Sequence, residues 1–224
     1  MAAVTGKTGK VKYTAAAATT AGGGTMTSIS ATTDRTGFRV ATVGHRHWDR
    51  TVAPVVYVNS TAHGSTEYAV NYVQGKVEFD AAFALSTAES AQVTADYSYH
   101  AFSYLPWTRA WAMDVDVAMH DITVFSTDAN AVQWRTFKEG LKGATVDMDR
   151  IVDTDSTSTP VWFDRLNTGQ DVVLELANIV SGTTYKWEAY AKVSSDGYDA
   201  PVDGVEAESV QFQVDGPMYY ASTE

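Results

Sequence analysis

Two segments of the chain alternate between apolar and polar residues with a period of two. One covers residues 93–99. The other runs from Trp111 to Met119, where Asp114 and Asp116 fall on the side opposite the apolar residues. Because successive side chains of a β-strand point to opposite faces of a sheet, both segments are predicted to be strands. The second strand would carry an acidic outer face.

Further short runs of β-branched and aromatic residues, separated by turn residues, predict more strands. They lie at 38–43, 54–59, 68–72, 76–79, 146–151, 172–177, 184–193 and 205–214. Gln74-Gly75 is expected to form a two-residue hairpin turn, because Gly readily adopts the positive φ that tight turns need. Residues 194–204 contain two Gly and one Pro and are predicted to be a loop.

Two segments are predicted to be helical. Ser126-Thr127-Asp128 can cap a helix over residues 130–141, and Gly140 or Gly143 would end it. The residues expected to pack this helix against a sheet are Val132, Trp134, Phe137 and Leu141. A second short helix is predicted from Pro160 to Leu166, since Pro suits the first helical turn.

The pattern divides the chain into three parts. Residues 1–27 are rich in Ala, Thr and Gly with few apolar residues, so they are expected to form a flexible N-terminal arm. Residues 28–106 are expected to form an N-terminal β module. The pattern resets near Pro106-Trp107, and residues 107–224 are expected to form a second β module that includes the helix at 130–141.

Charge is unevenly distributed along the chain, whose net charge is −11. Residues 1–50 hold seven Lys or Arg against two acids, a net of +5, whereas residues 145–224 hold four against fifteen, a net of −11. Such a dipolar chain favours stacking on copies of itself, and a soluble surface with clustered charges is the alternative. The acidic balance disfavours nucleic-acid binding, which needs clustered Lys and Arg.

Composition and motifs exclude several kinds of chemistry. With no Cys there is no disulfide, thiolate nucleophile or cysteine-based zinc site. No apolar segment is long enough to span a membrane, and no signal peptide is recognised, so neither secretion nor membrane insertion is expected. The opening GKTGK lacks the spacing of a phosphate-binding loop. Without a nucleophile elbow, and with acids too abundant to single out a carboxylate pair, an enzyme is not expected.

Two clusters contain residues that could bind a metal. His45-Arg46-His47 places two imidazoles on one side of an extended segment, but the Arg between them argues against a cation. Asp147, Asp149, Asp153 and Asp155 offer closely spaced oxygens for a weak calcium site, or form a solvated strand face. We expect no metal and no cofactor. The six Trp and twelve Tyr are expected to fill the core, with a sugar-stacking platform as the alternative.

Three runs follow one another in the second half of the chain: Asp121-Ile122-Thr123-Val124-Phe125, then WRTFKEGLK from Trp134 to Lys142, then Ala144-Thr145-Val146-Asp147. Through these runs, residues 107–215 resemble the tail-tube proteins of long-tailed bacteriophages. The final strands at 184–193 and 205–214 are also similar to that family. The N-terminal arm and the size of the N-terminal module depart from it.

The resemblance implies a mainly β fold, an antiparallel β-sandwich or barrel flanked by a short α-helix, with the N-terminal β module added. It implies a virion tail protein assembled in the host cytoplasm. Its partners would be copies of itself in stacked, hexameric rings, and other tail or neck proteins. The acidic residues Asp114, Asp116, Asp147 and Asp149 would line a channel through which DNA passes without specific binding.

Two other functions fit the same features. A capsid decoration protein, or another protein of the virion surface, also combines β modules with a flexible arm. A carbohydrate-binding module at the virion tip is the third possibility. Self-assembly separates the three, because a tube protein polymerises, a decoration protein binds shells, and a sugar binder stays small and binds glycans.

Overall fold

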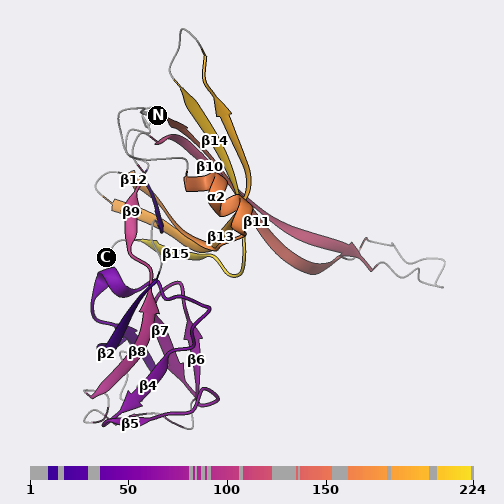
Figure 1. The fold of residues 1–224 in the computed structure, drawn as a ribbon. Coiled ribbons are helices and arrows are strands. Elements are labelled where there is room, and N and C mark those ends of the chain that lie inside the picture. The colour runs from indigo at the N-terminus through magenta and orange to yellow at the C-terminus, as the bar shows by residue number, and fades with distance from the viewer. Residues whose placement is uncertain are drawn as a thin grey trace, which may run out of the picture. The chain divides into compact units, whose positions relative to one another are not determined.

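A computed structural model gives the fold of the chain (Figure 1). It describes residues 10–14, 18–29, 36–80, 83, 85–86, 89, 92–105, 108–122, 135, 137–152, 161–180, 183–201 and 206–222. The fold is mainly β, with antiparallel strands and a short α-helix, as the sequence predicts. In the described part of the chain, no helix is long and apolar enough to cross a membrane.

The chain forms two compact units. Unit 1 comprises Met1–Pro106, Asp171–Ala191 and Gly216–Glu224, and unit 2 comprises Trp107–Gln170 and Lys192–Asp215. The division falls at Pro106 and Trp107, where the sequence pattern resets. Unit 1 nevertheless also takes two later segments, because their strands pair with strands from the beginning of the chain. Long-range pairing of this kind has no local sequence signal.

One sheet of unit 1 contains strands from both ends of the chain. Its elements are β1 (Lys10–Thr14), β9 (Phe102–Tyr104), β12 (Val172–Val180), the first part of β13 (Thr183–Asp199) and β15 (Tyr219–Ser222). β1 lies between β12 and β9, and β13 lies between β12 and β15. All residues from Val172 to Ala177 are buried. A strand covered on both faces is typically apolar along its length, and here only Glu175, which is paired with Lys12, interrupts the apolar residues.

The other sheet of unit 1 is formed by the strands between β1 and β9. In spatial order they are β5 (Thr61–Ala62), β4 (Val55–Val58), β8 (Val93–Tyr99), β2 (Thr19–Ser28), β3 (Gly37–Val40), β7 (Lys76–Phe79) and β6 (Tyr68–Asn71). A 3₁₀ turn, η1 (Val43–His45), follows β3. The predicted strands at 76–79 and 93–99 are confirmed to the residue.

This second sheet encloses its own apolar core. Phe38, Val56, Val77 and Val93 are completely or almost completely buried, and Trp48 stacks on Tyr97 with ring centroids 4.8 Å apart. Burial of such side chains contributes roughly 1.5–3 kcal/mol each. Trp48 is therefore a core residue, as the sequence predicts for most aromatic residues.

The hairpin between β6 and β7 is confirmed, with a longer turn than predicted. Asn71 pairs with Lys76, so four residues rather than two connect the strands. Gly75 adopts φ +57°, and a Cβ at this position would lie 2.6 Å from the carbonyl oxygen of Arg46. Both the positive φ and the close approach of backbone require glycine here.

Two predicted irregular segments contain strands. Residues 10–14 and 19–28, expected to belong to a flexible arm, form β1 and β2. Residues 194–199, expected to begin a loop, continue β13. In each case, pairing with neighbouring strands satisfies backbone groups of a segment with weak local preference.

Unit 2 is a sheet with a helix packed on it. Its strands are β10 (Thr108–Asp121), β11 (Phe137–Ile151), β14 (Ala207–Val214) and the end of β13, in that order, and its helix is α2 (Val161–Thr168). The predicted helix at 160–166 is confirmed in α2. Trp162 of α2 is buried and contacts Phe212 of β14 edge-to-face, with ring centroids 5.1 Å apart. The helix thereby covers one face of the sheet.

The other predicted helix, at 130–141, is wrong for its last five residues. Residues 137–141 belong to β11 and pair with β10, with Phe137 opposite Asp121 and Glu139 opposite Met119. Residues 123–134 and Thr136, which include Val132 and Trp134, lie outside the described residues. Tertiary pairing thus decides the structure of a segment whose sequence favours a helix.

Candidate functional site

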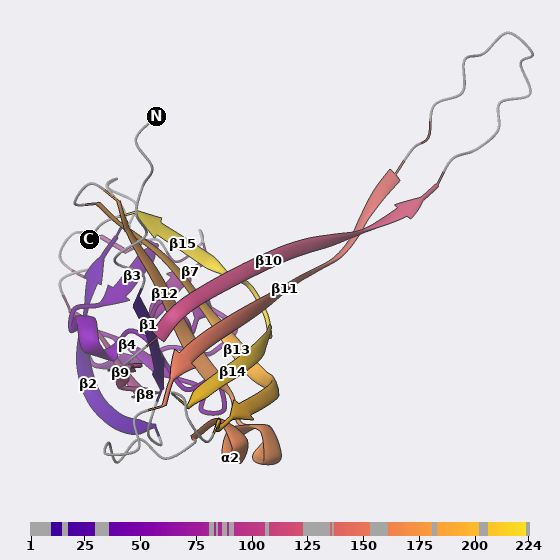
Figure 2. The same ribbon diagram turned by 90° about the horizontal axis from the view of Figure 1, so that it is seen from above.

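Strands β10 and β11 form a hairpin that extends beyond the rest of the sheet in unit 2 (Figure 2). β14 pairs with β11 only along residues 145–151. In the part of the chain that the structure describes, residues 137–144 pair with β10 alone. A two-stranded ribbon is only marginally stable in water by itself. We call this part, residues 115–121 with 137–144, the distal hairpin.

The four predicted acidic residues lie on one face of the hairpin. Asp114 is opposite Thr145, Ala112 is opposite Asp147, and Ala110 is opposite Asp149. Residues opposite one another in an antiparallel ladder project to the same face. Asp116 shares the parity of Asp114 and completes the set. All four side chains are exposed.

The acidic face is polar beyond the hairpin as well. Ser209 Oγ donates a hydrogen bond to Asp149 Oδ1 at 2.6 Å, and Gln211 Nε2 donates to Asp147 Oδ1 at 2.8 Å. These bonds hold two of the carboxylates in place across the β11–β14 pair. They also use oxygens that a calcium ion would need, and the other two residues of that candidate site, Asp153 and Asp155, lie outside the described residues.

The opposite face of the hairpin is apolar. Near its base, Val146 and Met148 are buried, and they face Phe212 and Val210 across the β11–β14 ladder. α2 covers this region through Trp162. The core of unit 2 therefore lies beneath the base of the hairpin.

The same face is uncovered in the distal hairpin, where two apolar residues of β10 are paired with Lys142 and Glu139 of β11. Val115 is 57% exposed, Met119 is 59% exposed, and Val117 between them is also exposed. Phe137 and Leu141, expected to pack a helix on a sheet, are instead 48% and 87% exposed, so that prediction is wrong. Clustered exposed apolar side chains on a two-stranded ribbon are typical of a surface that a partner covers.

A buried ionic group anchors the hairpin at its base. Arg150 of β11 and Glu208 of β14 are register partners, both almost fully buried, and the Arg150 Nε donates to Glu208 Oε2. Burial raises the pKa of Glu208, and the arginine partly offsets this. Burial likewise raises the pKa of Asp196 on β13, whose carboxyl group shares a hydrogen bond with Glu208. Charges from three neighbouring strands are thus tied together.

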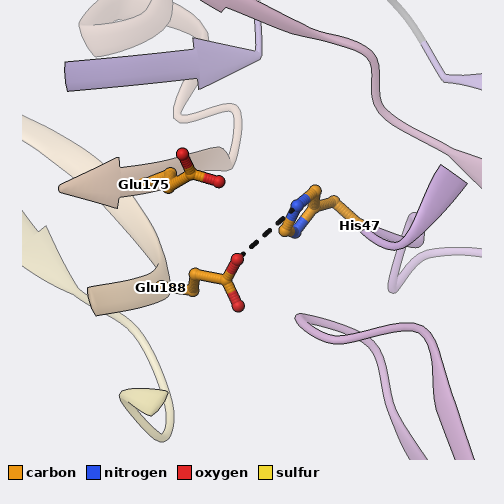
Figure 3. Close-up of side chains that lie close together, drawn as sticks. All are labelled: His47, Glu175 and Glu188. Carbon is orange, nitrogen blue, oxygen red and sulfur yellow. Dashed lines mark ion pairs between the residues drawn. The ribbon is translucent and has the colours of Figure 1, made fainter. Parts of the chain in front are cut away.

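A second ionic cluster, in unit 1, joins His47 to Glu175 and Glu188 (Figure 3). One ligand atom from each of the three lies within 4.8 Å of the others. His47 Nε2 is 3.9 Å from Glu188 Oε1. His47 and Glu175 are buried. His and carboxylate groups at such distances are the donors of many metal sites.

The charges around this cluster do not suit a metal ion. Lys12 Nζ lies 2.7 Å from Glu175 Oε1, and Lys186 Nζ lies 3.7 Å from Glu175 Oε2. Both ammonium groups lie at Glu175, the central carboxylate of the cluster, and their positive charge opposes a divalent cation there. Burial lowers the pKa of His47 to about 3, so the imidazole is neutral at physiological pH. We interpret the cluster as a structural ion-pair network.

The two imidazoles of His45-Arg46-His47 do not converge on one site. His45 stacks on Tyr99, with ring centroids 3.8 Å apart, and its Nδ1 lies 3.2 Å from the Tyr97 hydroxyl. His47 points into the ionic cluster instead. The sequence could not reveal the partners of His47, because Glu175 and Glu188 lie far along the chain on β12 and β13.

Comparison with known proteins gives structural likeness only. No protein-family model matches the chain, and no curated protein matches it. Three solved structures are similar over about half of the chain. A chain from the virion of a native gene transfer agent particle has 15% identity and a TM-score of 0.42, covering 54% of this chain and 88% of that one.

The other two similar structures are tails. One is the tail of an empty gene transfer agent particle with C6 symmetry, at 15% identity and a TM-score of 0.43, covering 54% of this chain and 87% of that one. The second is the SPP1 tail tube, at 13% identity and a TM-score of 0.39, covering 55% of this chain and 68% of that one. All three TM-scores are below 0.5.

Proposed function

We propose that this protein is a virion structural protein, the repeating subunit of a bacteriophage tail tube. The observation that carries the proposal is the β10–β11 hairpin, which carries Asp114, Asp116, Asp147 and Asp149 on one face and the exposed side chains of Val115, Val117 and Met119 on the other. The sequence resemblance of residues 107–215 supports it independently of this geometry.

Self-association accounts for the exposed face of the distal hairpin. Val115, Val117 and Met119 form a stripe along β10, which is also the edge strand of its sheet. Exposed edges with apolar side chains invite pairing with another chain, and native proteins leave them open where a partner covers them. A copy of the same chain would cover the stripe in a closed ring, where every subunit offers and receives the same contact.

A ring built in this way places the acidic face on the side away from the covered stripe. We assign Asp114, Asp116, Asp147 and Asp149 to the wall of a central channel. Carboxylates at the wall would repel the phosphates of DNA and let it slide without specific binding. The assignment fails if a structure of the assembled particle places these residues on its exterior or in a dry interface.

The tail-tube function also implies a ring symmetry, a location and a set of partners. The rings are hexameric and stack, as the sequence resemblance implies, and the protein is located in the virion tail after assembly in the host cytoplasm. Its partners are its own copies and other tail or neck proteins. A capsid decoration protein or other virion surface protein is the alternative function, and a carbohydrate-binding tip module is the third.

Negative-stain electron microscopy of the purified protein at rising concentration tests the proposal. Rings or hollow tubes of constant diameter are expected. Trimers, or particles that bind only to capsid shells, would contradict the tail-tube function and support the capsid decoration function. Uniform small particles at every concentration, also after addition of preformed tail ends as seeds, would contradict the proposed self-assembly.

A further inference from the structure

Strands β2 to β8 are inserted into the connection between two adjacent strands. β1 and β9 are antiparallel neighbours, with Lys12 opposite Tyr104 and Thr14 opposite Phe102. The chain therefore leaves this sheet at Thr14 and returns directly beside the point of departure. The intervening residues 19–99, called the inserted module, have a core of their own that runs from Met26 to Tyr97. A module with its own core can carry a function separate from that of the hairpin.

The outer face of the inserted module is hollowed. Across β3, β7 and β6, one row contains Gly37, Glu78 and Ala69, and the next contains Arg39, Lys76 and Asn71. The hollow has a volume of about 640 Å³, within the usual size range of small-ligand sites. Ala69, a small exposed residue on the edge strand β6, contributes to the floor of the hollow.

Two walls bound this hollow. Ile29 lies over Gly37, where a Cβ would be 3.0 Å from Ile29 Cγ1, so glycine leaves the space that the isoleucine requires. Tyr219 of β15 lines the hollow from the C-terminal segment. Tyr219 is paired with Glu188 in the β13–β15 ladder and packs against the cluster of Val73, Val173 and Tyr190. Its position is therefore fixed by packing.

The polar groups around the hollow are of mixed kind. Asn71 and Gln74 contribute amides, Lys76 an ammonium group and Glu78 a carboxylate. The backbone N–H of Gln74 donates to Asn71 Oδ1 at 3.2 Å, which orients the amide before any ligand arrives. Donors and acceptors stand side by side, and the charges of Lys76 and Glu78 oppose one another, so a polyanion gains little here.

We propose that this hollow binds a saccharide. Each hydroxyl group of a sugar both donates and accepts hydrogen bonds, which the mixed amide, ammonium and carboxylate groups match. The apolar face of a sugar ring suits an aromatic wall, here Tyr219. The site is formed by the inserted module together with Tyr219 of β15, and it does not depend on the distal hairpin or on tube formation.

An arrayed panel of bacterial and animal oligosaccharides, followed by titration calorimetry with the best-bound sugar, tests the site. Ala69→Tyr would fill the hollow from an exposed position on its floor. Ala62→Tyr is the matched control, because Ala62 is also exposed on an edge strand of the same module but does not line the hollow. Glu78→Ala removes one polar group without adding bulk.

The wild-type protein and Ala62→Tyr are expected to bind a saccharide with equal affinity. Ala69→Tyr is expected to weaken binding by about tenfold or more, and Glu78→Ala to weaken it to a smaller degree, at unchanged melting temperature. Binding of no sugar in the panel, or equal binding by Ala69→Tyr, would overturn the proposal. Neither result would change the formation of rings or tubes seen by electron microscopy. The saccharide site and the tail-tube function can therefore be disproved independently of one another.

Discussion

At the scale of single residues, buried titratable groups set the response of the fold to pH. His47 is the clearest example. Its imidazole is buried among Lys12, Lys186 and two glutamates, and Phe102 packs against its ring at 4.1 Å. Burial stabilises the neutral form of the His47 imidazole. The local sequence, two histidines on either side of an arginine, does not indicate this burial.

The free energy of unfolding is expected to fall as the pH drops from 6.5 to about 3. The pKa of His47 is about 3 in the folded protein and 6.5 when unfolded, so the unfolded chain binds the extra proton throughout this window. Stability gains up to about 1.4 kcal/mol per pH unit from this group as pH rises to 6.5. Urea unfolding of His47→Gln across this range should show a smaller slope than the wild type.

His120→Gln serves as the control for that series, since His120 is exposed on β10. Its slope between pH 3 and 6.5 should equal that of the wild type. An unchanged slope in His47→Gln would show that the imidazole is protonated in the fold and that our account of the cluster is wrong.

At the scale of elements, the turn between β6 and β7 depends on one glycine. Gly75→Ala is expected to destabilise the protein by about 1–3 kcal/mol, because its φ is positive and the new Cβ would meet the Arg46 carbonyl. Gly44→Ala is the matched control, since a Cβ at Gly44 meets nothing within 4 Å. Equal melting temperatures for the two variants would refute this explanation of the turn.

The base of the β10–β11 hairpin depends on the Arg150–Glu208 pair. Arg150→Met leaves Glu208 buried without its cation and is expected to cost about 3–5 kcal/mol. The double variant Arg150→Met with Glu208→Met removes both charges and is expected to recover most of that loss. Chemical denaturation of the wild type, Arg150→Met, Glu208→Met and the double variant forms a double-mutant cycle. A double variant no more stable than Arg150→Met would mean that the pair does not act through its charges.

The elements also show why one helix was predicted wrongly. Trp134, Phe137 and Leu141 are spaced for one helical face, yet Phe137 and Leu141 lie in β11. The Gly140 position shows how closely the strands approach, because a Cβ there would lie 2.5 Å from His120 Nε2. Residues 76–79 and 93–99 were predicted correctly because alternation with period two is a local property.

At the scale of the whole molecule, the proposed assembly depends on the exposed stripe of the distal hairpin. Val115→Lys is expected to abolish rings or tubes while leaving the melting temperature of the subunit unchanged, because it places a charge on a surface that a partner would cover. Val52→Lys is the matched control, since Val52 is also exposed but lies outside the hairpin. Sedimentation velocity and electron microscopy measure the outcome.

Assembly of Val115→Lys to the same extent as Val52→Lys would show that the stripe is not the contact. If the substitution instead damages the fold of the subunit, the melting temperature of Val115→Lys will be lower than that of the wild type. The same measurement on Asp114→Asn tests the opposite face, where unchanged assembly is expected because a channel wall takes no part in subunit contacts.

The four acidic residues show where the sequence stops being informative. Within each strand, alternation alone places Asp114 with Asp116, and Asp147 with Asp149. That both pairs share one face follows only from the β10–β11 register, because a shift by one residue would separate them. The partners of His47 were beyond prediction for the same reason, since they come from strands that meet it only in the fold.

The sequence by itself determined the mainly β class, most strand positions and the alternation that makes β10 apolar on one side and acidic on the other. These depend on neighbours a few residues apart. Only the tertiary structure decided that residues 19–99 are inserted between β1 and β9, that residues 137–141 form a strand, and that the end of the hairpin stays uncovered. Each of these depends on pairing between distant segments, whose free energy exceeds local preference.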